Sequence, residues 1–265
     1  RITLKERLLI RESISLTSLQ GIVRFARYIL TFTFSIELIG ALLLSIQFIP
    51  EFGLGKGIYY SIFHAVSAFC NAGFDLMGGY SSVTGYSGNA LIILTLSALI
   101  IIGGLGFYVW DDLYNYKINR RLSLQTKVVI SMSLFLIVFG FVMFFIFEYS
   151  NPATLKEMSM KDKLLSAFFA SVSPRTAGFN SIDLAGMSMA SVLLTIILMF
   201  IGGSPGSTAG GIKTSTAGVL LLTVMSVIKG REDTEVFRKK ISKETVYKAF
   251  AVVVIALGLV FTVTI

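Results

Sequence analysis

Long apolar runs separated by short polar stretches set the pattern of this chain. Continuous runs cover about 25–49, 89–113 and 124–149, a run interrupted by polar residues covers about 188–229, and a last run begins near residue 244. As a helix, about 20 apolar residues span the hydrocarbon core of a bilayer. The pattern therefore predicts four complete membrane crossings, one of them broken, and the start of a fifth, in an all-α membrane protein.

Composition and charge support this interpretation. Hydrophobic residues make up 54% of the chain and charged residues 14%, against about 25% charged residues in a typical soluble domain. Of the 23 Lys and Arg residues, 17 lie within residues 1–27, 117–127 and 229–248, which fall on one face if the spans alternate. The positive-inside rule makes that face cytoplasmic. The net charge of +8 therefore indicates topology or contact with anionic lipid, and no nucleic-acid partner is expected.

Two segments between the spans repeat each other at a constant offset of 105 residues. The copies are Phe63–Ala65 with Asn71–Asp75, and Phe168–Ala170 with Thr176–Asn180. Each copy contains a stretch of helical spacing, at about 58–70 and 162–173, that is only about 12 residues long and cannot cross a bilayer. A half-length helix between two spanning helices is the layout of a re-entrant pore loop. Two copies favour a pore over a tight turn after a buried helix.

The chemistry of these loops suits a cation. Gly73 and Gly178 can adopt backbone angles closed to other residues, so that successive carbonyls point at a desolvated ion. The partial negative charge at the C-terminal end of each short helix favours a cation at the same place. Asp75 follows the first loop, where it either concentrates cations at a pore mouth or caps the next turn, and Asn180 holds the equivalent place in the second loop.

A polar, Gly-rich run, Ile201–Thr216, interrupts the fourth apolar stretch. Two separate crossings here would put Arg231 on the outer face, against the charge pattern, so we expect one crossing broken near mid-membrane. Flexible polar backbone at that depth must face a water-filled cavity. Lys213 in this run either repels a cation, bonds loop carbonyls or extends toward the cytoplasm. The corresponding Ile102–Gly106 is shorter and apolar, which indicates a flexible inner helix or close helix packing.

On these residues the chain resembles the Trk/Ktr/HKT superfamily of potassium transporters, and most of all the bacterial Ktr membrane subunit. Phe144–Pro152 and Pro174–Asn180 carry the strongest likeness. The resemblance implies four helix–pore loop–helix repeats around one pseudo-fourfold pore, as in potassium channels. The expected parts are a cytoplasmic leader at 1–24, the second repeat at 25–113, a cytoplasmic linker at 114–123, the third repeat at 124–229 with its inner helix broken at 202–214, a basic cytoplasmic linker at 230–243, and the truncated first helix of the fourth repeat at 244–265. The first and fourth filters would lie outside this sequence.

The resemblance also implies site residues. Backbone carbonyls of two filter segments would line the potassium sites, namely those of Asn71, Ala72, Gly73, Phe74, Thr176, Ala177, Gly178 and Phe179. Glycine at both central positions would make the pore potassium-selective, with Asp75 and Asn180 at its mouth. The Gly-rich run would obstruct the pore as a gate formed by Gly202, Gly203, Ser204, Pro205, Gly206, Ser207, Thr208, Ala209, Gly210, Gly211 and Lys213.

The predicted function is that of the pore-forming subunit of a potassium uptake system, with gated, passive conduction and no enzymatic activity. No cofactor is expected in this chain beyond bound K⁺. The resemblance implies a homodimer in the plasma or inner membrane, crossing it several times, and a cytoplasmic ring of regulatory subunits that binds a nucleotide. The alternatives are a sodium-dependent secondary transporter and a non-conducting accessory subunit of an ion-translocating ATPase.

Two further polar residues lie within apolar segments. Arg175 precedes the second filter segment, and because a fixed cation near a potassium site is costly, we expect it to pair with Asp75, Asp183 or Glu148. His64 is the only histidine. It has no second ligand at metal-binding spacing, so we expect it to pack as a neutral side chain.

Overall fold

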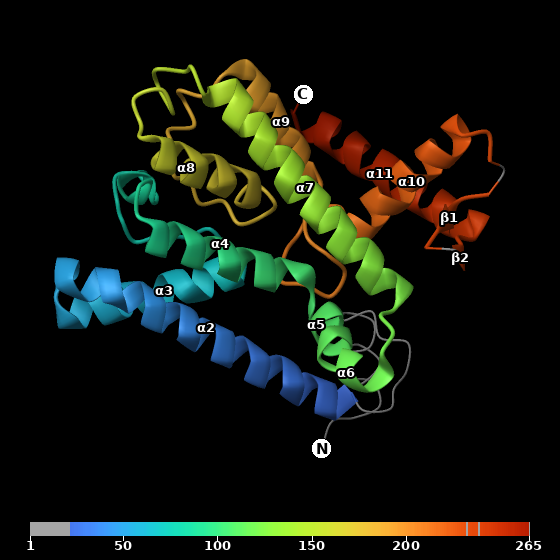
Figure 1. Ribbon diagram of the computed structural model, residues 1–265, viewed down its shortest axis with the longest axis horizontal. Helices are drawn as coiled ribbons and strands as arrows, with labels where there is room; N and C mark the ends of the chain where they lie inside the picture. The colour runs from blue at the N-terminus through green and yellow to red at the C-terminus, as the bar shows by residue number, and fades with distance from the viewer. Residues whose placement is uncertain (1–21, 232, 238, 265) are drawn as a thin grey trace.

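The computed structural model of this chain describes residues 22–264 apart from 232 and 238, so most of the expected leader at 1–24 lies outside the described residues. Helices dominate the fold (Figure 1). In chain order the elements are α2 (Ile22–Phe52), α3 (Leu54–Phe69), the 3-10 turn η1 (Thr84–Tyr86), α4 (Ala90–Leu105), α5 (Phe107–Tyr114), α6 (Tyr116–Asn119), α7 (Leu124–Glu148), α8 (Met160–Val172), α9 (Met189–Phe200), α10 (Thr214–Ile228), β1 (Glu235–Val236), β2 (Lys239–Lys240) and α11 (Lys243–Thr264).

Within the described residues, three helices are long and apolar enough to cross a membrane, in α2, α7 and α11. Helices α4 and α5 form a further candidate pair, but they meet at a bend of 90°. Helices α9 and α10 are shorter apolar helices on either side of the Gly-rich run. The predicted all-α membrane fold is confirmed. The expected span at 89–113 is not one straight helix, because Gly106, with a φ of 89°, ends α4.

Helices α2, α3 and α4 form one packed unit, which we call the first unit. Gly57 brings α3 against the end of α2, since a Cβ at Gly57 would lie only 2.6 Å from the Cα of Ile49. Asn89 caps α4, because its side chain accepts hydrogen bonds from the backbone N–H groups of Leu91 and Ile92. Helix α3, with 16 residues, is longer than the expected stretch of about 12 and equals α4 in length, but it is about half as long as α2, which has 31 residues.

Helices α7, α8, α9 and α10 form the equivalent second unit. Gly140 lets α7 approach α8, since a Cβ there would lie 2.5 Å from Ser171 Oγ. At the outer end of α7, the fully buried Glu148 accepts hydrogen bonds from the Thr154 hydroxyl and from the N–H and hydroxyl of Ser188, the N-cap of α9. This carboxylate ties the end of one membrane helix to the start of the next.

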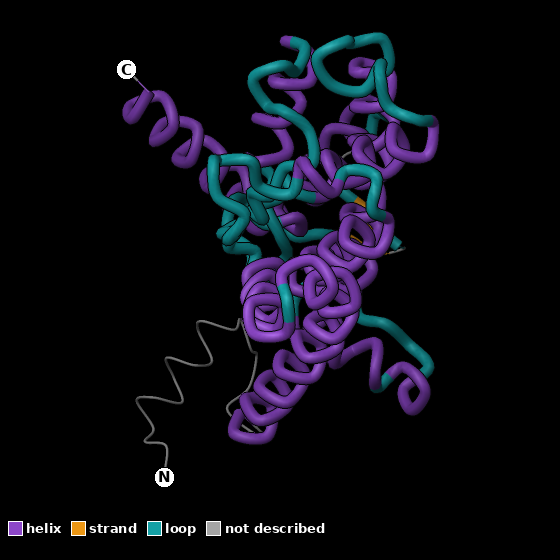
Figure 2. The backbone as a smooth tube through the Cα atoms, turned by 90° about the vertical axis from the view of Figure 1, so that its left-hand side faces the viewer, coloured by secondary structure: helices purple, strands orange, loops and turns teal. Residues whose placement is uncertain are grey.

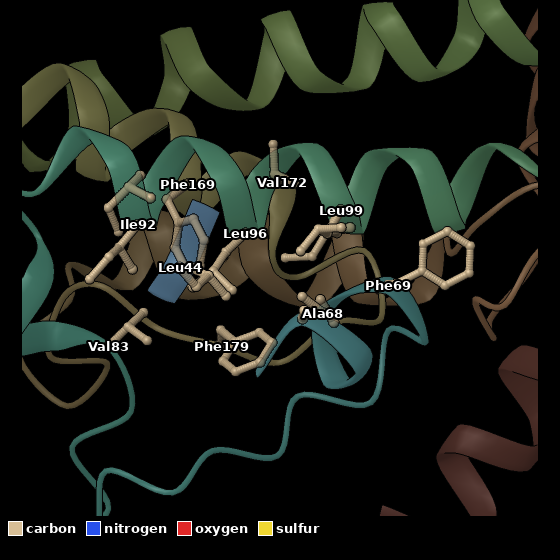
Figure 3. Packing of buried hydrophobic residues seen from close by; sticks show 14 of the residues in the cluster. Leu44, Ala68, Phe69, Val83, Ile92, Leu96, Leu99, Phe169, Val172 and Phe179 are labelled. Carbon is tan, nitrogen blue, oxygen red and sulfur yellow. The ribbon is translucent and has the colours of Figure 1, made fainter. Parts of the chain in front are cut away.

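A hydrophobic core joins the two units. Helix α4 contacts both half-length helices, α3 and α8. Figure 3 shows Ile92, Leu96 and Leu99 of α4 in one cluster with Phe169 and Val172 of α8, and each of these side chains is at most 3% exposed. Because lipid is as apolar as these side chains, the packing stabilises the fold through van der Waals contact rather than by removing surface from water.

The outer faces of the long helices are apolar and exposed. Phe34 of α2 is 68% exposed, Leu134 of α7 is 60% exposed and Ile255 of α11 is 63% exposed. Helix α11 packs mainly on α10, and Figure 2 shows its C-terminal part projecting from the remaining helices. Apolar surface of this extent would promote aggregation in water but matches a lipid environment. The chain is therefore a membrane protein.

A two-stranded hairpin, formed by β1 and β2, lies in the segment that the sequence predicts only as a basic linker. At its turn, the Phe237 ring lies 5.7 Å from Lys127 Nζ, at the start of α7. This contact brings together two of the three basic segments, as their placement on one side of the membrane requires.

Candidate functional site

The two predicted filter segments lie against each other in the structure. Each begins where a half-length helix, α3 or α8, ends. A Cβ at Gly73 would lie 2.0 Å from the carbonyl oxygen of Ala177 and 3.1 Å from the Cα of Gly178. Glycine is therefore required at residue 73 by the contact between the loops as well as by its φ of 73°.

Alternate residues in both segments have left-handed backbone angles. The φ angle is 53° at Asn71 and 73° at Gly73, and it is 80° at Thr176 and 92° at Gly178. Alternating handedness turns neighbouring peptide planes the same way, so that carbonyls can line one side of the segment, as cation coordination requires. A left-handed conformation costs a β-branched residue such as Thr176 about 1–3 kcal/mol. Contacts around the second segment must therefore hold this shape.

A serine near the end of each half-length helix supplies such a contact. Ser67 Oγ donates to the Phe74 carbonyl at 2.7 Å, and Ser173 Oγ donates to the Phe179 carbonyl. The carbonyls of the same two serines accept hydrogen bonds from backbone N–H groups of the filter segments. A serine hydroxyl thus fixes the last carbonyl of each segment. The ion-lining role of the eight carbonyls stays a prediction. Neither serine stands out in the sequence, because the two lie one position off the 105-residue repeat.

The two predicted mouth residues have different surroundings. Asp75 Oδ1 accepts a hydrogen bond from the N–H of Met77 at 2.9 Å, which is the turn-capping alternative. Asn180 is clamped by the first unit instead. Its N–H donates to Ser82 Oγ and its carbonyl accepts from the N–H of Val83, both at 3.1 Å. The outer end of the second filter segment therefore depends on the unit that carries the first.

Arg175 is buried beside the second segment, with 4% of its surface exposed. Its Nη1 donates to the carbonyl of Ser133 on α7 at 3.2 Å, and its Nε has no hydrogen-bond partner among the described residues. The expectation that it pairs with an acidic residue is wrong within this part of the chain. Glu148 lies 15 residues beyond Ser133 on α7, about 22 Å away along the helix axis, and its oxygens are taken by other donors.

His64 supports the segment that follows the first filter. The residue is fully buried on α3. Its Nδ1 lies 2.7 Å from the Tyr60 carbonyl, and its Nε2 accepts a hydrogen bond from the N–H of Leu76 at 3.3 Å. An accepting Nε2 requires the proton on Nδ1, so the imidazole is neutral, in agreement with its prediction as a packed side chain.

The Gly-rich run forms a closed loop between α9 and α10, which we call the intramembrane loop (residues 201–213). Its backbone bonds to itself: the N–H of Gly202 donates to Ile212 at 3.0 Å and that of Gly203 donates to Gly210 at 3.2 Å. A Cβ at Gly202 would lie 1.9 Å from the Gly210 carbonyl oxygen. Lys213 Nζ donates to the Ala209 carbonyl at 2.8 Å, so of its three predicted roles the structure shows the bonding of a loop carbonyl.

The intramembrane loop docks on the inner helix of the first unit. The N–H of Ser204 donates to the Gly104 carbonyl at 2.9 Å, and that of Thr208 donates to the Gly103 carbonyl at 3.2 Å. The glycines of Ile102–Gly106 leave room for this approach, so close packing is the interpretation that the structure supports there. The predicted gate residues therefore lie together with the first filter segment and with α4.

Comparisons with known proteins agree with this architecture. The TrkH family, described as a cation transport protein, matches residues 3–265. The chain is 44% identical to the potassium/sodium uptake protein NtpJ of Enterococcus hirae, over 98% of this chain and 57% of that protein. It is 40% identical to the Ktr system potassium uptake protein B of Bacillus subtilis, over 98% of this chain and 58% of that protein. The chain thus spans a little more than half the length of these relatives.

A solved structure shows a similar fold. The potassium transporter TrkH from Vibrio parahaemolyticus is similar with a TM-score of 0.71 and 20% sequence identity, over 97% of this chain and 54% of that chain. At this level of identity the likeness concerns the arrangement of helices. It supports the all-α membrane fold described above.

Proposed function

Because the chain belongs to the TrkH family of cation transport proteins, we propose that it forms part of the pore of a potassium uptake protein, with passive conduction through a carbonyl-lined filter and an intramembrane gate. Its family is one of transporters and not of enzymes. One observation carries the proposal: two glycine loops meet at Gly73 and Ala177, each at the C-terminal end of a half-length helix.

Potassium would be bound in the filter by backbone oxygens in place of water. An ion that enters a narrow site loses its hydration shell, and a row of carbonyls restores that coordination. The C-terminal ends of α3 and α8 add partial negative charge at the same level. Carbonyls carry only partial charges, so the ion is held weakly enough to move on, as conduction requires. A carboxylate in the same place would hold it more tightly.

The intramembrane loop would act as the gate. It is closed by its own hydrogen bonds and docks on α4 next to the first filter segment. In this position Thr208 of the loop contacts Phe69 and Asn71 at the start of the first filter segment. Opening then requires the loop to leave its seat on Gly103 and Gly104, which breaks the two backbone hydrogen bonds to these glycines and a third from the N–H of Phe107 to the Gly206 carbonyl. A few hydrogen bonds of about 1 kcal/mol each are within reach of a regulatory partner.

The same family supports a proposal for the location and partners of this protein. We place the protein in the plasma or inner membrane as a multi-pass homodimer. The name of the Bacillus subtilis relative refers to a Ktr system, which supports further components, and we propose a cytoplasmic ring of nucleotide-binding regulatory subunits. Lys127 and the basic hairpin at 235–240 lie together on the predicted cytoplasmic side. They offer a docking surface for that ring or for anionic lipid.

Sodium coupling is the second candidate, because one relative is named a potassium/sodium uptake protein. The test is uptake of K⁺ and Na⁺ by the full-length protein in vesicles at a clamped membrane potential. We expect potassium-selective flux that follows the gradient. A dependence of K⁺ flux on Na⁺ at fixed potential would replace the channel by a coupled transporter. No flux, with the regulatory partner present, would leave a non-conducting accessory subunit.

A further inference from the structure

Thr208 of the intramembrane loop contacts the base of the first filter segment directly. Its hydroxyl donates to the carbonyl of Phe69 at 2.8 Å and accepts from Asn71 Nδ2 at 3.0 Å. Both partners lie more than 130 residues away in the sequence. Both hydrogen bonds of the hydroxyl, the one that it donates and the one that it accepts, are therefore made to the first unit and not to other residues of the loop.

Both partners of Thr208 are positions that fix the shape of the filter. Phe69 is the last residue of α3, and the final carbonyls of a helix have no partner within it. Asn71 opens the filter segment with a φ of 53° and is 8% exposed. Among the described residues, its Nδ2 reaches, besides Thr208, only the carbonyls of Phe69 at 3.3 Å and Ile100 at 3.5 Å. Thr208 thus provides the shortest bond of this amide.

Gly103 of α4 makes this contact possible. A Cβ at Gly103 would lie 2.0 Å from the Phe69 carbonyl oxygen and 2.8 Å from Thr208 Oγ1. At the neighbouring Gly104, the nearest atom to such a Cβ is Asn71 Nδ2 at 4.0 Å, an ordinary contact. A side chain at Gly103 would therefore displace the Phe69 carbonyl and Thr208, whereas a Cβ at Gly104 fits without a clash.

We propose that Thr208 is a positioning residue of the first filter, so that the docked loop sets the ion preference of the filter while it blocks the pore. The inference rests on the proposed function. When the loop leaves its seat, Phe69 and Asn71 lose the bonds from Thr208, and the inner end of the filter is free to relax. The contact of Thr208 with Phe69 and Asn71 then couples the position of the loop to the ion selectivity of the filter.

The test compares Thr208→Val, Thr208→Ser and Ser207→Ala in the full-length protein, by the K⁺ and Na⁺ affinities of the purified protein with its loop docked, and by total K⁺ flux in vesicles. Valine keeps the shape of threonine but removes both hydrogen bonds, and we expect it to lower the ratio of K⁺ to Na⁺ affinity by about threefold to tenfold. Serine keeps the hydroxyl and should restore the ratio. Ser207 Oγ donates to Ser204 within the loop, so Ser207→Ala should alter the total flux and leave the ratio at its wild-type value.

Gly103→Ala and Gly104→Ala give an independent readout, which also applies if Thr208→Val does not fold. We expect the first to lower the K⁺/Na⁺ ratio and the second to keep it. Flux changes without any change of ratio in Thr208→Val and Gly103→Ala would overturn the proposal and leave the loop as a gate alone. Absence of K⁺ flux in the wild-type protein would instead contradict the proposed function itself.

Discussion

The two units of this chain share one plan and differ where the inner helix passes the predicted filter segment. In the first unit, α4 remains helical to Leu105 and then bends by 90° into α5. In the second, the inner helix is interrupted for the whole of residues 201–213, between α9 and α10. The difference is complementary, because the glycines of the unbroken helix form the seat on which the broken one places its loop. Glycines therefore leave room for a docked loop in the first unit, whereas in the second unit they form the loop itself.

The largest expected effect separates the two filter glycines. Gly73→Ser would place a side chain against the Ala177 carbonyl, where a Cβ already lies at 2.0 Å, whereas the nearest atom to a Cβ at Gly178 is 3.7 Å away. Since both positions have positive φ, both variants are strained, but only Gly73→Ser also separates the loops. We expect K⁺ flux to fall by about a hundredfold or more in Gly73→Ser. Gly178→Ser should retain flux and admit more Na⁺ relative to K⁺.

Vesicle flux with both ions measures these two variants side by side. Unchanged selectivity in Gly178→Ser would remove Gly178 from the filter. Equal losses in both variants would show that the contact between the loops is not the limiting feature.

The next effect compares the outer ends of α2 and α7. Glu148 is fully buried with several donors, while Glu51 at the end of α2 is exposed and accepts one hydrogen bond, from the Tyr86 hydroxyl at 2.7 Å. Burial and the Glu51 carboxylate raise the pKa of Tyr86 above its usual value, so this hydroxyl stays a donor at neutral pH. Thr154 and Ser188 donate to different oxygens of Glu148, so Glu148→Gln replaces the acceptor of one of these hydroxyls by an NH₂ donor and should lower the free energy of unfolding by about 2 kcal/mol or more.

Glu51→Gln keeps its accepting oxygen and should cost less than about 0.5 kcal/mol, as for an exposed site. Thermal unfolding of the two variants in detergent gives the comparison directly. Equal midpoints would mean that the Glu148 network does not hold α7 to α9.

Removal of residues 204–210 tests the complementarity of the units. Without these residues the seat on Gly103 and Gly104 is empty, and we expect basal K⁺ flux to rise by about tenfold, equivalent to about 1.4 kcal/mol less in the barrier. Flux is compared per molecule of protein in the membrane. A silent variant at normal membrane content would contradict the gating role of the loop.

The smallest effect concerns Lys213. Because its Nζ bonds to the Ala209 carbonyl inside the loop, Lys213→Gln should loosen the loop without removing it, and basal K⁺ flux should rise by about twofold to threefold. A rise as large as that of the deletion would instead indicate direct electrostatic repulsion of the ion. The same vesicle assay at two salt concentrations distinguishes these cases, since screening weakens only the electrostatic barrier.

The short helices α3 and α8 and the left-handed glycines that follow them were predictable from the sequence because their determinants are local. A stretch of helical spacing too short for a bilayer, followed by a glycine that needs a left-handed angle, is visible in each copy at the same offset. The broken helix was predictable for the same reason, since consecutive glycines around Pro205 prevent a continuous helix within an apolar run.

The features that the sequence does not reveal all depend on contacts between distant segments. The bend at Gly106 follows from the approach of the loop, whose Pro205 carbonyl would lie 2.7 Å from a Cβ at Gly106. The expected acidic partner of Arg175 is absent among the described residues, because Arg175, which follows α8, reaches α7 at Ser133 and not at Glu148. Composition and spacing do not show at which point along a helix two distant segments come into contact.

The seat at Gly103 also bears on how the chain could have arisen by duplication. Two identical units would carry either two loops or two seats, and neither pair fits together. The loop residue Thr208 and the seat residue Gly103 therefore have to differ for the two units to fit together. A chimaera that replaces the second unit by a copy of the first would retain two glycine filters and have nothing to close them.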